Sequence, residues 1–172
     1  KLKFKYLINN TGMQAGNRLF IGFGASIPSD NVLTSSPFFE VGEVEPHRHF
    51  ALSDGNYKGL IELQYFKKTN YNPVFWGLTA EASMPLIDSD YGYASGESYN
   101  IALTTLFKLN SKNAVKPIGI SLGLFYLNTG QGYWNDLIDP SSKSTMIVPS
   151  IGAIWKIGKH GLSINIQKPQ LI

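Results

Sequence analysis

Hydrophobic and polar residues alternate along almost the whole chain. The alternation runs through eight segments, which are Leu2–Asn9, Arg18–Pro28, Tyr57–Lys68, Val74–Leu86, Glu97–Asn110, Pro117–Asn128, Ser144–Lys156 and Leu162–Lys168. A period of two residues is typical of strands that have one apolar and one polar face. No segment of the sequence has the 3.6-residue period of an amphipathic helix with capping residues. The pattern therefore predicts an all-β protein.

The predicted strands are long, at about 9 to 14 residues, whereas strands of water-soluble sheets most often have about 5 to 6. A strand that crosses a bilayer at a tilt needs about 9 to 11 residues. The connections alternate between tight turns and long loops rich in Ser, Asp, Asn, Gly and Tyr. This layout, with a polar face of mainly small residues, favours an antiparallel transmembrane β-barrel. A water-soluble sandwich or lipocalin-like barrel is the alternative.

The direction of the predicted strands bears on the domain organisation. Eight alternating strands place both ends of the chain on the side of the long loops. Bacterial single-chain barrels have an even number of strands, and one more strand at each end would bring both termini to the other side. We therefore expect residues 1–172 to form a single β-barrel domain, an excerpt of a barrel of about ten strands or more. A self-contained eight-stranded barrel is the alternative.

Proline positions agree with this assignment of strands in all but one case. Pro28, Pro73, Pro117 and most other prolines fall at strand ends or in connections, where the missing backbone donor does least harm. Pro149 lies inside a predicted strand. It suggests a bulge there, or a strand that begins later.

Composition narrows the class of protein further. Hydrophobic residues make up 43% of the chain and charged residues only 16%, which argues against disorder. The apolar runs are far shorter than the roughly 20 residues of a membrane-spanning helix. The formal net charge is +3 and the basic residues are scattered, so nucleic acid is not expected as a partner. The chain has no cysteine, which excludes disulfides and thiolate metal sites.

Three stretches of the chain are similar to those of a known family. They are Gly24–Ser29, His47–Gly55 followed by Leu60–Tyr65, and Val148–Lys156 followed by Leu162–Pro169. These stretches resemble a broad family of bacterial outer-membrane "transporter" barrels, often labelled by its link to a phenol-degradation (meta-cleavage) pathway. The chain departs from the family by having Ser29-Asp30 where Thr-Gly is common, and by lacking both ends. The resemblance implies a channel or transporter in the bacterial outer membrane, with lipid around it and small solutes, hydrophobic ones included, as its cargo.

Charged residues on the polar faces are the candidate lining of the lumen. They are Lys3, Lys5, Arg18, Glu62, Glu81 and Lys108. Charges that line a lumen tune which solutes pass. The same residues could instead form a salt-bridged plug that fixes the shape of the barrel, and the sequence leaves both interpretations open.

The longest loop carries the only cluster with metal-binding chemistry. His47 and His49 share a face of an extended backbone, and with Asp54 they could hold Zn²⁺, Cu²⁺ or Ni²⁺. A solvated polar loop is the alternative, because Arg48 between the histidines disfavours a cation. No spacing of His, Ser and Asp is diagnostic of an enzyme, so neither catalysis nor a cofactor is predicted.

The loops also suggest a function of a different class. Phe38, Phe39, Tyr133 and Trp134 lie in the long connections, and aromatic residues on loops fit a protein interface. In this alternative the barrel is an outer-membrane anchoring or assembly subunit, and its loops bind another envelope protein.

Overall fold

The computed structural model describes residues 1–12, 15–32, 34, 52–110 and 116–172, and every regular element in this part of the chain is a strand. The eight long strands are β1 (Leu2–Asn10), β2 (Gly16–Ser26), β3 (Tyr57–Lys68), β4 (Phe75–Ile87), β6 (Ser98–Lys108), β7 (Gly119–Thr129), β10 (Ser144–Ile157) and β11 (His160–Gln167). The short strands are β5 (Tyr93–Ala94), β8 (Tyr133–Trp134), β9 (Leu137–Ile138) and β12 (Gln170–Leu171). The predicted all-β fold is confirmed, and each predicted segment coincides with one long strand.

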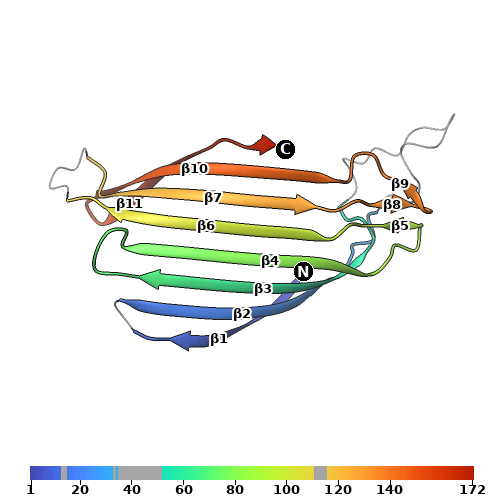
Figure 1. The fold of residues 1–172 in the computed structure, drawn as a ribbon, viewed down its shortest axis with the longest axis horizontal. Coiled ribbons are helices and arrows are strands. Elements are labelled where there is room, and N and C mark those ends of the chain that lie inside the picture. Colours follow the sequence, from blue (N-terminus) through green and yellow to red (C-terminus); the bar gives the residue numbers. More distant parts are fainter. Residues whose placement is uncertain (13–14, 33, 35–51, 111–115) are drawn as a thin grey trace.

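The long strands form one antiparallel sheet in the order β1-β2-β3-β4-β6-β7-β10-β11, so that each long strand pairs with the next one along the chain (Figure 1). Strand β12 extends the last strand and pairs with β10. Within the described residues β1 pairs only with β2, and β11 pairs only with β10. The sheet is therefore open here, and a closed barrel is not found. No helix in this part of the chain is long and apolar enough to cross a membrane.

The connections differ between the two ends of the sheet. Tight turns join β3 to β4 and β10 to β11 at one end, whereas the second sheet, β5-β8-β9, is built from the long connections at the other (Figure 1). We call these the short-turn end and the long-loop end. In the β3–β4 turn, Thr69 N donates to Val74 O at 3.0 Å and the Thr69 hydroxyl donates to Pro73 O at 2.7 Å. Leu2 pairs with Ala25, so β1 starts near the long-loop end.

Pro149 neither forms a bulge nor delays its strand. Strand β10 runs through it, and the register with β7 is continuous on both sides. The interruption lies on the neighbouring strand instead: Lys168 N donates to Pro149 O at 3.1 Å, and the last strand is divided there into β11 and β12. Proline has no N–H to return to that neighbour, so the ladder breaks on the partner strand.

The sheet has one apolar face that no other described element covers. Paired rows of hydrophobic residues cross it, such as Phe4, Phe23 and Ile61, which are 69%, 55% and 46% exposed. Among the described residues only Leu60, Tyr93, Trp134 and Val148 are buried hydrophobic residues. The usual core between two packed layers is therefore missing from this part of the chain.

Candidate functional site

Ion pairs join the polar faces of β1, β3 and β4. Lys5 Nζ lies 2.7 Å from Glu62 Oε1, and Lys1 Nζ lies 2.8 Å from Glu81 Oε1. Lys3 contacts both carboxylates, Glu62 and Glu81. Glu62 and Glu81 are themselves direct partners across the β3–β4 pair. We call these five residues the ion cluster.

Two glycines of β2 make the cluster possible. Gly22 pairs with Lys5 on one side and Glu62 on the other, and Gly24 pairs with Lys3. A Cβ atom at Gly22 would lie 3.3 Å from Glu62 Cβ and 3.5 Å from Lys5 Cγ. Because β2 has no side chain at these positions, the lysines of β1 pass over it and reach β3 and β4.

The carboxylates are the buried members of the ion cluster. The side chain of Glu62 is 4% exposed and that of Glu81 14%, whereas Lys3 and Lys5 are 25% and 42% exposed. A buried carboxylate that lost its partners would be strongly destabilising, since its charge would be neither hydrated nor neutralised. Three ammonium groups face two carboxylates, which leaves one positive charge in excess. The cluster can therefore tie β1 to the sheet and can also present a fixed charge to a solute.

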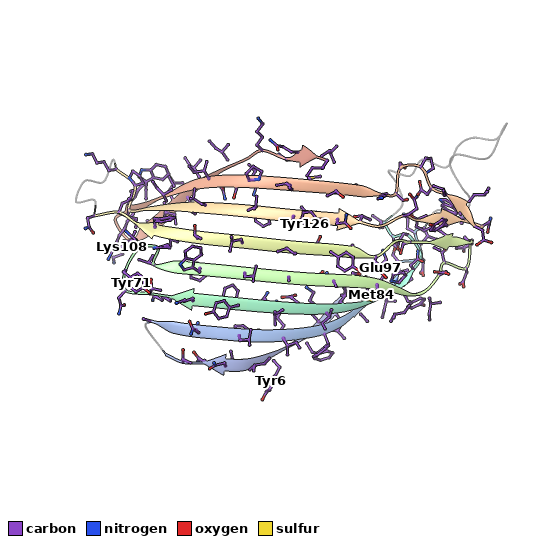
Figure 2. All side chains as sticks on the ribbon, viewed as in Figure 1. Tyr6, Tyr71, Met84, Glu97, Lys108 and Tyr126 are labelled. Carbon is purple, nitrogen blue, oxygen red and sulfur yellow. The ribbon has the colours of Figure 1, made fainter. Side chains whose placement is uncertain are left out.

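The structure brings together four of the six predicted lumen residues, Lys3, Lys5, Glu62 and Glu81. Arg18 lies nearer the short-turn end, where its Nε donates to Asn10 Oδ1 at 3.4 Å. Lys108 lies at the short-turn end of the sheet (Figure 2). Its backbone N–H and C=O each form a 2.8 Å hydrogen bond with the Asn72 side chain.

Only one residue of the predicted metal site lies in the described part of the chain. His47 and His49 lie outside the described residues, so their part in a metal site stays a prediction. Asp54 is described: it forms an ion pair with Lys58 and accepts a 3.3 Å hydrogen bond from Asn56 N. The described ranges contain no group of three or more His, Asp or Glu residues placed to hold a metal ion.

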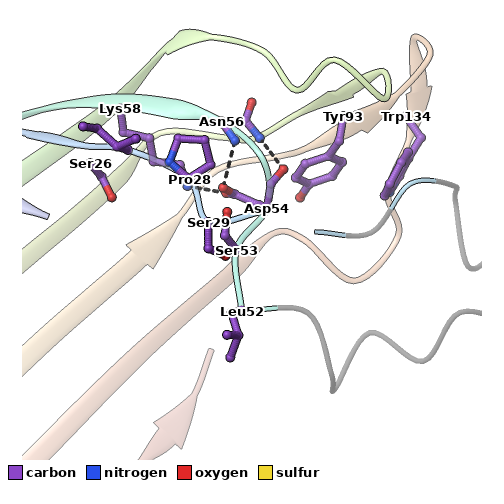
Figure 3. Close-up of a pocket in the computed structure, with 11 residues that line it drawn as sticks. Ser26, Pro28, Ser29, Leu52, Ser53, Asp54, Asn56, Lys58, Tyr93 and Trp134 are labelled. Carbon is purple, nitrogen blue, oxygen red and sulfur yellow. Dashed lines mark hydrogen bonds and ion pairs between the residues drawn. The ribbon is translucent and has the colours of Figure 1, made fainter. Parts of the chain in front are cut away.

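A cavity of about 580 Å³ lies at the long-loop end, and the sequence analysis did not anticipate it (Figure 3). We call it the rim cavity. It is lined by the end of β2 and the chain after it, the start of β3 and the chain before it, and two aromatic residues of the second sheet. The described residues that line it are Ser26, Ile27, Pro28, Ser29, Leu52, Ser53, Asp54, Asn56, Lys58, Tyr93 and Trp134.

Local turns position the polar wall of the rim cavity. Gly55 has φ +80°, which favours glycine, and a Cβ there would lie 2.4 Å from Ser89 Oγ. This turn lets Asn56 Nδ2 donate to Asp54 O at 2.9 Å, while Asn56 Oδ1 accepts from Ser95 N at 3.3 Å. Asn56 is 2% exposed, so it ties the start of β3 to the chain after β5.

A two-residue hairpin turn places the aromatic wall. Asn135 and Asp136 have φ of 46° and 68°, as a type I′ turn requires, and they join β8 to β9. The Trp134 ring lies 4.9 Å from the Tyr93 ring. The Asn-Asp pair after an aromatic residue was the one signal in the sequence that could have indicated this hairpin.

The predicted partner-contacting residues are placed differently from one another. Phe38 and Phe39 lie outside the described residues. Tyr133 is 42% exposed, whereas Trp134 is 3% exposed and lines the rim cavity, and contact of either with a partner stays a prediction. Residues that follow each other in a strand point to opposite faces, which is why one ring is outside and its neighbour inside.

Comparison with known proteins adds no relative. No protein-family profile matches the chain, and no curated protein or solved structure is significantly similar to it.

Proposed function

We propose that this chain forms part of a β-barrel in the bacterial outer membrane that lets small solutes pass. The uncovered apolar face of the sheet is the observation that carries the proposal. Ile101, Leu103 and Leu124 lie near its middle, and each is 39% to 46% exposed. Exposed apolar surface costs about 25 cal/mol per Å² in water and nothing comparable in lipid hydrocarbon.

The edges of the sheet set a second requirement. A bilayer offers no water to the unpaired N–H and C=O groups of an edge strand, so only a closed barrel is tolerated there. Strands β1 and β11 would therefore pair with each other or with further strands when the protein lies in the membrane. The expected barrel of about ten strands or more meets this requirement.

The polar face suits a water-filled lumen. Its central rows include small or polar residues, Thr79, Thr104, Gly123 and Ser150 among them, beside the ion cluster, and they also hold Phe125 and Val148. Solutes would pass without covalent chemistry and without a cofactor. The charges of the ion cluster would influence which solutes pass. The resemblance to the phenol-pathway "transporter" barrels agrees with this role and extends it to hydrophobic solutes.

A second function rests on exposed side chains of the β8–β9 hairpin. Tyr133, Leu137 and Ile138 are 42%, 55% and 59% exposed. Exposed apolar side chains on a loop fit contact with another envelope protein, and the barrel would then serve as an anchor. Stable copurification with one defined envelope protein, without any permeability, would favour this function over the first.

Liposome swelling tests the proposed function. The purified chain is inserted into liposomes, and swelling is followed with uncharged solutes of increasing size, from glycerol to sucrose. We expect swelling that falls with solute size and is absent from protein-free liposomes. A chain that is monodisperse in buffer without detergent, with its apolar rows shielded from water, would overturn the proposal.

A further inference from the structure

We propose that the polar face of the sheet admits small anions in preference to cations, and that basic residues at its short-turn end set this preference. These residues are Arg18, Lys68, Lys108 and Lys156, and we call them the cation row. The inference deepens the proposed function and rests on it, because selection between ions needs a water-filled lumen. Two observations carry it: the four residues share one face of the sheet, and the sequence places no acidic residue near them.

The register of the strands places the cation row on the polar face. Side chains that are an even number of positions apart on one strand point to the same face. By this rule each member shares a face with a polar-face residue of its own strand, and these residues are Gly22, Glu62, Thr104 and Ser150. The strand pairing is continuous between the compared positions. The cation row therefore lies on the same face as the ion cluster.

The members of the cation row lie at the short-turn end, and all of them are exposed. Lys68 and Lys108 are the last residues of β3 and β6. Arg18 lies near the start of β2 and Lys156 near the end of β10. Figure 2 shows Lys108 at this end of the sheet. The row thus extends from β2 to β10 across most of the sheet, so it acts on ions through its electric field and not as a compact pocket.

The sequence supplies no negative charge to the short-turn end. Residues 1–29, 63–80, 98–135 and 140–172 contain no Asp or Glu. Every connection at the short-turn end falls within these ranges, and so do residues 13–14 and 111–115, which lie outside the described residues. The remaining acidic residues, apart from two, belong to the connections that join the strands at the long-loop end.

Those two exceptions are Glu62 and Glu81, the only acidic residues on the long strands. The ion cluster already places three lysine ammonium groups against them. None of the ion pairs in the described part of the chain involves a member of the cation row. The positive charge of the row is therefore not neutralised within the sheet.

A fixed positive charge of this kind favours anions. Arg and Lys side chains that line a pore select anions over cations. One unit charge about 7 Å from the path of a monovalent ion changes the local concentration of that ion about threefold in water of low ionic strength. The Debye length falls from about 10 Å in 0.1 M salt to about 3 Å in 1 M salt, so the preference should weaken as salt is added.

Reversal potentials in a planar bilayer under a KCl gradient test the inference. We expect the wild type to pass Cl⁻ in preference to K⁺ in dilute salt. Lys68→Gln/Lys156→Gln removes two charges of the cation row and should lower the Cl⁻/K⁺ permeability ratio about threefold or more.

A matched control removes the same charge from the same end of the sheet. In Lys67→Gln/Lys159→Gln, Lys67 is the neighbour of Lys68 on the opposite, apolar face, where it pairs with Trp76, and Lys159 lies in the β10–β11 turn. This variant should keep a ratio close to that of the wild type. All four substitutions replace one polar side chain by another at a strand end or in a turn, so each double variant should unfold at about the wild-type temperature.

The outcomes separate this inference from the proposed function. Equal permeability ratios in the two double variants would overturn the role of the cation row. A wild type that conducts but prefers K⁺ would overturn the inference and leave the channel standing. Absence of any ion current would overturn both.

Discussion

The Lys5 ammonium on β1 lies 2.7 Å from the Glu62 carboxylate on β3, and the residue between them on β2 is Gly22. The contact joins strands that are not neighbours, so it depends on the absence of a side chain in the middle. It also ties the outer strand β1 to β3, a strand inside the sheet, since β1 pairs only with β2 in the described part of the chain.

Gly22→Val should therefore weaken the sheet. The new side chain would meet Glu62 Cβ and Lys5 Cγ and would separate the charges, at a cost of about 1–3 kcal/mol in the free energy of unfolding. Gly161→Val is the matched control, because a Cβ there meets nothing within 4 Å. Thermal or urea unfolding in detergent, followed by circular dichroism, measures both. An equal loss in the two variants would contradict the role of Gly22.

The ion cluster should set charge selectivity if the sheet lines a lumen. The double variant Glu62→Gln/Glu81→Gln leaves three lysines unopposed and should shift the reversal potential in a planar bilayer towards anion selectivity. Lys3→Met/Lys5→Met should shift it towards cations. Lys159→Met, in the β10–β11 turn, is the control and should leave it unchanged. If neither double variant shifts the potential, the cluster acts as a structural brace and does not face the path of ions.

A lysine should be tolerated on one face of β6 and not on the other. Leu103 belongs to the exposed apolar face, and its neighbour Thr104 lies on the polar face, where it pairs with Gly77 and Gly123. Leu103→Lys should cost about 2–4 kcal/mol in a bilayer, the value for a charge at mid-depth of a barrel wall. Thr104→Lys should cost much less. Unfolding in lipid vesicles compares them, and similar costs would argue against lipid on the Leu103 side.

Asp139 should hold the loop between β7 and β10 in shape. Its side chain is fully buried, and Oδ1 accepts from Ser141 N at 3.1 Å and from the Ser141 hydroxyl at 3.3 Å. Asp139→Ala removes both hydrogen bonds to the buried carboxylate, at a cost of about 1–3 kcal/mol. We expect faster proteolysis within residues 130–143, measured by mass spectrometry. Asp90→Ala, an exposed position, is the control, and equal cleavage rates in both variants would speak against this role.

The strands were predictable because the residue pattern that specifies a strand is local in the sequence. Side chains alternate between two faces of a strand, so a row such as Leu2, Phe4 and Tyr6 indicates both the strand and its apolar face. Pro149 shows the limit of this reasoning. A proline has no backbone N–H, and the loss affects the neighbouring strand whose carbonyl would have accepted that hydrogen bond. Which strand becomes this neighbour is not a local property of the sequence.

The candidate sites were predictable only in part, for the same reason. The alternation of side chains along the predicted strands placed four residues on polar faces: Lys3, Lys5, Glu62 and Glu81. It could not pair Lys3 with Glu81, which is 78 positions away. The rim cavity was missed altogether, because Trp134 becomes buried only when a hairpin from one loop packs against Tyr93 from another.

The alternation of residues along the chain accounts for the eight long strands, for their apolar and polar faces, and for the tight turns between some of them. Each of these features is set by neighbours within a few positions. The register of the strands, the passage of two lysines over Gly22 and Gly24, and the burial of Trp134 were set by packing between distant segments. Such contacts depend on the shapes and distances of groups that meet only in the folded chain. They cannot be read from the order of the residues.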